Sequence, residues 1–229
     1  MSDIFEPHAV TDLLHLANEE DYLASTNKGR IRKSNENLIL FAAERAFSQY
    51  GFKGTTMAQI AEEAGLPKAN LHYYFSSKKN LYLHLLDRIM TEWLHPMSEI
   101  YPDADPKVAL EAYVRQKMHL VFERPHASKL FANELLQGAK VVNGLLHTTL
   151  KELVAEKSAV IDEWVREGKI KPVDSVQLFF SLWAMTQTYA DFDVQINAVL
   201  GTSIDAPEQQ ERAVEHVLTM LFRTCGLAE

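Results

Sequence analysis

Three side chains recur at four-residue spacing in the last quarter of the chain: Trp183, Gln187 and Asp191. Residues four apart share one face of an α-helix. The same segment carries apolar residues that are expected to bury much of this helix: Leu178, Phe179, Leu182 and Ala190. A buried amide and a buried carboxylate both need hydrogen-bond partners. The spacing therefore indicates a polar site inside a helical core.

A planar, pyrimidine-like ligand with N–H and C=O edges would satisfy Gln187 and Asp191, and the ring of Trp183 or Trp93 could stack on it. The alternative is that the amide and the carboxylate bond to neighbouring helices and that both tryptophans are ordinary core. The spacing leaves this choice open.

A second group of polar side chains lies on a short helix expected after Pro67: Lys68, Asn70, His72 and Tyr73. Long polar side chains on an exposed helix can reach base edges in the major groove of DNA. Another short helix is expected just before it, with Thr56 as its N-cap and Gly65 in the connecting turn. Ala61 and Ala64 provide small residues where the two helices would cross. This is the outline of a helix-turn-helix, which other small helical hairpins share.

The distribution of charge supports a nucleic-acid partner for this segment. The whole chain has a formal net charge of −8, which by itself would argue against DNA binding. Residues 28–80, however, carry nine Lys or Arg and four Asp or Glu, whereas residues 1–27 carry six acidic residues and no Lys or Arg. A local positive patch matters more for binding a polyanion than the global charge does.

The hydrophobic periodicity predicts an all-α fold with an N-terminal three-helix helix-turn-helix domain and a C-terminal helical domain. We expect an acidic extension over 1–27, either a short helix or a mobile tail, a DNA-binding domain over 28–80 and an effector-binding and dimerisation domain over 81–229. A basic arm at 28–33 would precede the first helix. The helices are expected near 34–50, 57–65, 67–75, 77–95, 106–123, 126–138, 143–168, 174–199 and 207–224.

The stretch AAERAFSQYGFKGTTMAQIAEEAGLPKANLHYYFSSKKNLYLHLL resembles the DNA-binding domain of the TetR family along its whole length. The resemblance implies that Thr56 donates to a phosphate, that Lys68, Ala69 and Asn70 face the major groove, and that Tyr73 contacts a phosphate or a thymine methyl. It also implies a phosphate contact for Lys78 at the start of the fourth helix. The basic arm, with Lys28, Arg30, Arg32 and Lys33, would follow the backbone or enter the minor groove. His72 and Pro67 depart from the residues common in the family, which blurs any inference about the operator sequence.

Nearly the whole of residues 80–200 resembles a narrower group of TetR-type regulators, the YcdC-like repressors of pyrimidine utilisation. The matching stretches are Thr91–Pro96, Leu130–Phe131, Glu134–Ala139, Glu156–Ile161, Trp164–Val165, Gly168–Ile170, Trp183–Ala184, Thr186–Gln187 and Tyr189–Phe192. The resemblance implies a small-molecule effector such as uracil, held by Trp93, Trp183, Gln187 and Asp191. An unrelated effector in the same scaffold remains an alternative, because one or two substitutions can change the specificity of a pocket.

The family resemblance also implies a homodimer, in which the last two helices of each subunit form a four-helix bundle. The helix expected over 207–224 carries an apolar stripe that could meet the second subunit: Val214, Val217, Leu218, Leu221 and Phe222. Two symmetric DNA-binding heads would read a palindromic operator in double-stranded DNA. The alternative is that the stripe packs within its own chain.

Two other classes of protein compete with a regulator. An enzyme is disfavoured because no His-Glu-x-x-His, Gly-x-Ser-x-Gly or phosphate-binding loop is present, and no metal or cofactor is expected, since His119, His126 and His147 stand apart on predicted helices. A helical interaction module without DNA binding is disfavoured by the positive segment. The single cysteine, Cys225, and the lack of a signal peptide or of an apolar run long enough to span a bilayer predict a cytoplasmic protein without a membrane partner.

Overall fold

The computed structural model describes the backbone of residues 27–227 and the side chains from residue 31 onward. Every regular element in this part of the chain is helical, which confirms the predicted fold class. The alternatives for residues 1–27, a short helix or a tail, lie almost wholly outside the described residues, as do the side chains of Lys28 and Arg30.

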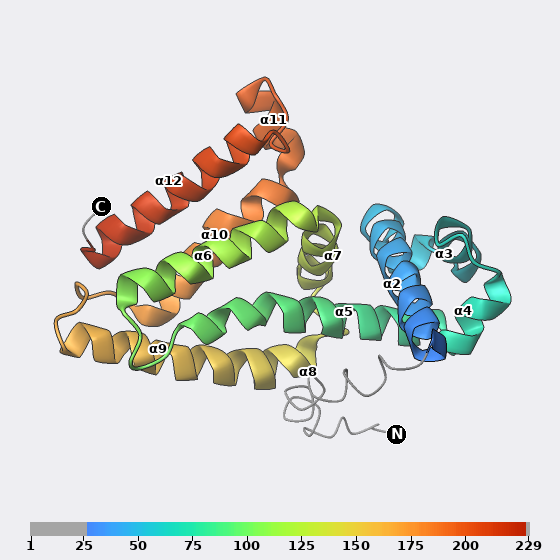
Figure 1. Ribbon diagram of the computed structural model, residues 1–229, viewed down its shortest axis with the longest axis horizontal. Helices are drawn as coiled ribbons and strands as arrows, with labels where there is room; N and C mark the ends of the chain where they lie inside the picture. Colours follow the sequence, from blue (N-terminus) through green and yellow to red (C-terminus); the bar gives the residue numbers. More distant parts are fainter. Residues whose placement is uncertain (1–26, 228–229) are drawn as a thin grey trace.

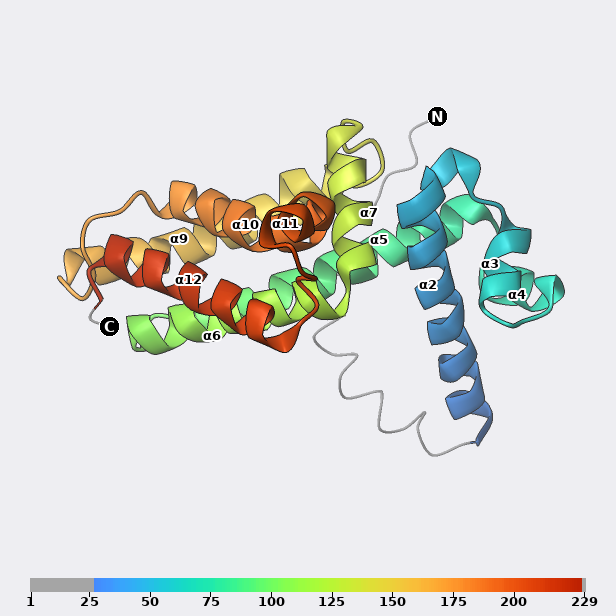
Figure 2. The same ribbon diagram turned by 90° about the horizontal axis from the view of Figure 1, so that it is seen from above.

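The first three helices gather at one end of the molecule (Figure 1). They are α2 (Asn27–Gly54), α3 (Met57–Glu63) and α4 (Lys68–Tyr74). The next helix, α5 (Lys78–Leu94), starts among them and runs on into the rest of the molecule, so it joins the head to the body. Figure 2 shows α2 crossing the line of α5 at a steep angle.

The body consists of the remaining helices. In chain order they are η1 (His95–Glu99), α6 (Pro106–Glu123), α7 (Pro125–Leu136), α8 (Asn143–Leu145), the π-turn η2 (Leu146–Leu150), α9 (Lys151–Arg166), α10 (Ser175–Asp191), α11 (Asp193–Leu200) and α12 (Pro207–Cys225). In Figure 1, α6 and α10 form a middle layer, with α5 and α9 on one side of it and α12 on the other.

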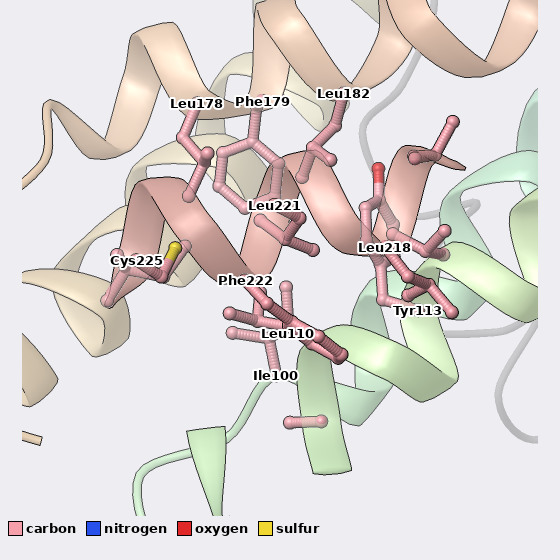
Figure 3. Packing of buried hydrophobic residues seen from close by; sticks show 14 of the residues in the cluster. Ile100, Leu110, Tyr113, Leu178, Phe179, Leu182, Leu218, Leu221, Phe222 and Cys225 are labelled. Atoms are coloured by element: carbon pink, nitrogen blue, oxygen red, sulfur yellow. The ribbon is translucent and has the colours of Figure 1, made fainter. Parts of the chain in front are cut away.

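The body core lies where α6, α10 and α12 meet. Figure 3 shows side chains from all three: Leu110 and Tyr113 from α6, Leu178, Phe179 and Leu182 from α10, and Leu218, Leu221 and Phe222 from α12. The expectation that the α12 stripe meets a second subunit is therefore wrong. Its members, Val214, Val217, Leu218, Leu221 and Phe222, are buried inside their own chain, because α12 needs an apolar face to dock on α6 and α10.

A second core holds the head together and extends into α7. Ile39 and Phe47 of α2 belong to the same buried cluster as Ala127, Leu130 and Phe131 of α7. Both views place α7 beside α2 (Figures 1 and 2). Helix α7 is thus the element of the body on which the head rests.

Three of the expected helices differ most from the observed ones. Helix α2 begins at Asn27 rather than at Ser34, because Lys and Arg are good helix formers and residues 28–33 simply continue the helix. The segment expected over 174–199 breaks at Phe192, whose ψ of 32° interrupts the helix before Asp193 begins the next. The segment expected over 143–168 contains the π-turn.

Candidate nucleic-acid interface and effector site

The second helix of the head is fixed at its start by a reciprocal cap. The Thr56 side chain accepts a hydrogen bond from the backbone N–H of Gln59 at 3.2 Å, and the Thr56 N–H donates to Gln59 Oε1 at 2.8 Å. This satisfies two backbone donors that the helix itself cannot pair. The Thr56 hydroxyl also donates to Gln59 Oε1 at 2.9 Å. The hydroxyl expected to donate to a phosphate thus lies at an exposed helix start, with its one hydrogen donated to Gln59.

A tight turn then sets the angle between α3 and α4. Gly65 has a φ of +65°, a left-handed conformation that glycine adopts without the cost met by other residues. The Leu66 N–H donates to the Ala61 carbonyl at 3.0 Å across this turn. Ile60, Ala61 and Leu71 are buried between the two helices. The pair is therefore a rigid unit in which α4 has one face inside and one face outside.

The outer face of α4 carries the polar residues singled out in the sequence. Lys68, Ala69 and His72 are exposed, Tyr73 is 74% exposed, and Asn70 is half-buried. The neighbours on the inner face behave differently. Phe75 is buried and Tyr74 is half-buried, with its hydroxyl accepting a hydrogen bond from Asn35 at 3.4 Å. Arg32 and Lys33 are exposed on the first turns of α2.

Lys78 has a role that sequence reasoning missed. Its Nζ donates to the carbonyls of Phe52 at 2.7 Å and Thr55 at 2.8 Å, and it lies 4.6 Å from the centre of the Phe52 ring. Two of the three ammonium hydrogens thus tie the start of α5 to the connection between α2 and α3. In the first turn of α5, the Asn80 N–H donates to the Ser77 hydroxyl oxygen at 3.1 Å, which caps the helix.

The four residues expected at the effector site come from two helices, α5 and α10. Trp93 of α5 is buried, and its ring packs 5.7 Å from that of Phe131. Trp183 of α10 is half-buried and uses its Nε1–H to donate to the Tyr113 hydroxyl at 3.0 Å, so the polar edge of this tryptophan is already occupied.

The polar members of the group lie one and two turns further along α10. Gln187 is half-buried, and within the described part of the chain its side chain makes no hydrogen bond. Asp191 is half-buried and accepts a hydrogen bond from the Ser128 hydroxyl of α7 at 2.6 Å. Burial raises the pKa of Asp191, against the opposing influence of Ser128 and of the ammonium groups of Lys117 and Lys129.

The structure adds Lys117 of α6 to this group. Its side chain is 5% exposed, and its Nζ lies 5.1 Å from the centre of the Trp93 ring. Burial lowers the pKa of Lys117 to about 8, although the charge of Asp191 opposes the shift. A sequence signal for it existed, because Tyr113, Lys117 and Val121 are spaced four apart and therefore place a lysine on the apolar face of α6.

The candidate effector residues, Trp93, Lys117, Trp183, Gln187 and Asp191, lie next to the junction between body and head. Arg124, at the connection of α6 and α7, forms ion pairs with Glu44 of α2 and Glu92 of α5. On α7, His126 Nδ1 lies 3.0 Å from the hydroxyl oxygen of Ser48 in α2. Helix α7 thus touches Asp191 through Ser128 and touches the head two residues earlier.

Neither a metal cluster nor a membrane span is found among the described residues. No group of three or more His, Cys, Asp or Glu side chains is placed there to hold a metal ion. None of the helices in this range has the length and apolarity needed to cross a membrane.

Comparison with known proteins identifies relatives of this chain. Residues 39–85 match the family described as bacterial regulatory proteins of the tetR family, and residues 86–228 match the C-terminal region of YcdC-like proteins. The regulator RutR of Escherichia coli K12 is 42% identical over 195 residues, which cover 85% of this chain and 92% of RutR. The repressor NicS of Pseudomonas putida is 28% identical over 134 residues, covering 58% of this chain and 62% of NicS.

Solved structures share the fold at lower identity. PfmR from Thermus thermophilus has a TM-score of 0.64 and 19% identity, covering 81% of this chain and 97% of that one. AibR in complex with isovaleryl coenzyme A and operator DNA has a TM-score of 0.64 and 22% identity, covering 83% and 99%. The matching family and these relatives are transcriptional regulators and not enzymes. The chain therefore belongs to the TetR family of bacterial transcriptional regulators, with a C-terminal region of the YcdC-like type.

Proposed function

We propose that this regulator is a repressor that binds a palindromic operator as a homodimer, through the outer face of α4, under the control of a small effector. The observation that carries the proposal is the outward polar face of α4, with Lys68, His72 and Tyr73 exposed on a rigid helix-turn-helix. The head, residues 28–80, would contact DNA, residues 81–229 would bind the effector and the second subunit, and the acidic residues 1–27 would precede both.

A gel-shift titration with the DNA upstream of the regulator's own gene tests this proposal. Binding that rests on phosphate contacts falls steeply as salt rises, by about 10³- to 10⁵-fold between roughly 50 and 200 mM for six to ten contacts. The variant Lys68→Ala should weaken binding. Lys151→Ala, which removes an exposed charge from α9 in the body, is the matched control and should leave it unchanged. Indifference to salt would contradict the proposal.

The second subunit is proposed to cover α10 and α11. Three exposed residues spaced four apart on α10, Val176, Phe180 and Ala184, form an outward strip. Phe192, Val194 and Val199, at the end of α10 and on α11, are also exposed, at 57%, 79% and 81%. Two open hollows of about 220 and 470 Å³ lie along α11. Exposed apolar surface of this extent on a chain of a dimeric family is best explained by a symmetric partner.

The effector is proposed to be pyrimidine-like and to bind near Trp93, Trp183, Gln187 and Asp191. Two observations support this class: the Gln187 amide, which makes no hydrogen bond to the residues that the structure describes, and the 42% identity to RutR. The variant Asp191→Ala should lose the effector response and keep its affinity for DNA, which a titration of the variant–operator complex with uracil measures. If uracil released DNA from this variant as it does from the wild type, Asp191 would be excluded as an effector-binding residue. The alternative is an unrelated effector, such as the isovaleryl coenzyme A that is bound in the AibR structure.

A further inference from the structure

One face of α2 carries apolar side chains that remain exposed. Ile31 is 61% exposed, and Leu38 and Phe41 are each 47% exposed. Steps of seven and three residues keep all three on the same side of a helix, so they form one strip, which we call the α2 strip. The neighbouring residues Ile39 and Ala43 are buried and point into the core of the head instead. Apolar side chains grouped in this way on a surface indicate that another segment covers them.

Positive charge lies beside the α2 strip. Arg32 and Lys33 follow Ile31 directly and are exposed. Arg32 forms no ion pair with any residue that the structure describes. Two residues after Lys33, the Asn35 side chain donates to the Tyr74 hydroxyl at 3.4 Å, so the first turns of α2 lie beside α4. Whatever covers the α2 strip therefore lies close to cations at the proposed DNA-binding surface.

Residues 1–26 join the chain at the first turn of α2 and complement this surface. They carry six acidic residues and no Lys or Arg. They also contain Val10, Leu13, Leu14 and Ala17, at a spacing that would place these apolar side chains on one face of a helix. Both the negative charge and the apolar pattern of this segment thus match what lies exposed along α2.

The length of the segment allows such a contact. Ten residues separate Ala17 from Asn27, and ten residues of extended chain span up to about 33 Å. The fourteen residues from Asn27 to Phe41 in α2 cover about 21 Å along the helix axis. A contact within one chain also benefits from a millimolar effective concentration when the tether is short. A modest apolar contact is therefore enough to hold the segment on the head.

We propose that residues 1–26 fold back onto the α2 strip and hold their carboxylates beside Arg32 and Lys33, where these carboxylates compete with DNA phosphates. The segment is then an internal competitor that weakens binding to every duplex, because phosphate contacts carry no sequence information. This inference rests on the proposed DNA binding through the head. It goes beyond that function by giving the acidic segment a task of its own.

Competition of this kind has a characteristic salt dependence. Cations that carboxylates already neutralise release no counterions when DNA binds, so the segment makes the decrease of DNA affinity with salt shallower. Loss of the carboxylates should steepen the slope of log affinity against log salt by about 0.9 for each cation that is freed. The gain in affinity should accordingly be largest at low salt.

Fluorescence anisotropy of the full-length protein on a random duplex measures the competition without knowledge of the operator. The test variant replaces three acidic residues of the segment by amides: Glu19→Gln/Glu20→Gln/Asp21→Asn. It should bind the duplex at least about fivefold more tightly than the wild type at roughly 50 mM salt, and the difference should disappear towards roughly 300 mM.

The matched control makes the same change of net charge in the body. It replaces three exposed acidic residues there: Asp103→Asn/Glu152→Gln/Asp162→Asn. Exposed charges further away than the Debye length are largely screened, so the control should bind the duplex within about twofold of the wild type. Equal gains in the test variant and the control would mean that only the net charge matters.

Uncharged substitutions test the contact with the α2 strip. Leu13→Ser/Leu14→Ser removes apolar side chains from the segment, and Leu38→Gln removes one from the α2 strip. Each change should tighten binding to the random duplex, and the combined variant should gain no more than the larger single effect, because both break one contact. Damage to the head would lower the affinity, so a gain cannot come from misfolding. Leu136→Gln, at an 83% exposed position on α7, is the control and should leave the affinity unchanged.

The outcomes distinguish this inference from the proposed function. If none of these proteins binds operator or random DNA, the proposed function is overturned. If DNA is bound, the inference alone is overturned when the variant with three amides in the segment gains no more than its control. It is also overturned when the Leu13/Leu14 variant binds like the wild type, since charge would then act without docking. A Leu38→Gln protein that changes from dimer to monomer would overturn it too, because the α2 strip would then be an interface between copies.

Discussion

Charged side chains that the fold buries have different partners, and the differences indicate their roles. Glu134 accepts from the Tyr82 hydroxyl at 2.9 Å and from the Val141 N–H at 2.7 Å, so it is fully engaged in joining α5 and α7. Glu44 is paired with Arg124. Lys117 alone in this comparison lacks such a partner in the described chain. Glu134 and Glu44 therefore join elements of the fold, whereas Lys117 is buried beside the Trp93 ring without such a bond.

The titration of Lys117 predicts a pH-dependent stability. Its pKa is about 8 in the folded protein and 10.5 in the unfolded chain, so the unfolded state binds more protons between these values and stability rises with pH there. Below pH 8 the buried ammonium lowers the free energy of unfolding by about 3 kcal/mol. The negative charge of Asp191 on α10 opposes this lowering of the Lys117 pKa.

Lys117→Met should therefore be more stable than the wild type at about pH 7, and the gap should shrink towards about pH 10. Urea unfolding of both proteins across this range measures the difference, and titrations common to the two cancel. A gap that stays constant with pH would mean that the pKa of Lys117 is not perturbed.

At the scale of helices, the connection between α6 and α7 links the body to the head. The Arg124 side chain is 14% exposed. It forms ion pairs with Glu44, whose side chain is 5% exposed, and with Glu92, whose side chain is 31% exposed. Loss of one partner of a buried ion pair strands the other charge, so Arg124→Met should lower the free energy of unfolding by about 3–5 kcal/mol. Glu92→Gln is the control, and it should cost under about 1 kcal/mol because this partner is partly exposed. If the two variants lowered the free energy of unfolding equally in urea, the ion pair between Arg124 and Glu44 would not be a buried link between head and body.

The cap of α3 fixes the start of the first helix of the helix-turn-helix. Thr56→Ala removes the side-chain acceptor for the Gln59 N–H and should cost about 1 kcal/mol of stability. It should also weaken operator binding, since the start of α3 loses its fixed geometry. Thr91→Ala, at an exposed position on α5, is the control and should change stability by less than about 0.5 kcal/mol. Identical melting curves for Thr56→Ala and the wild type would show that the cap is dispensable.

The head could be predicted from the sequence more completely than the body. Caps, turn glycines and apolar stripes are local signals, and they placed α3, α4, α5 and α6 within one or two residues of their observed bounds. The α12 stripe was assigned to the wrong neighbour, because periodicity shows that a face is buried but not against what. Lys117 was missed for the same reason, since only the packing of α5, α6 and α10 brings it beside Trp93 and Asp191.

At the scale of the whole molecule, positive charge is concentrated in residues 28–80, whereas the rest of the chain is acidic. The proposed dimer surface on α10 and α11 predicts that Phe180→Glu with Val199→Glu yields a monomer, because charges replace apolar contacts across the interface. Light scattering coupled to size-exclusion chromatography measures the mass. Leu136→Glu, at an 83% exposed position on α7, is the control and should remain a dimer. A wild type that runs as a monomer at micromolar concentration would contradict the dimer.

The operator affinity of Asn70→Ala/Tyr73→Ala, measured by fluorescence anisotropy against an operator duplex and a random duplex, tests the reading role of α4 most directly. Each lost base contact should cost about 1–3 kcal/mol, so operator affinity should fall at least about tenfold while affinity for the random duplex changes little. Operator affinity equal to that of the wild type would contradict a reading role for α4.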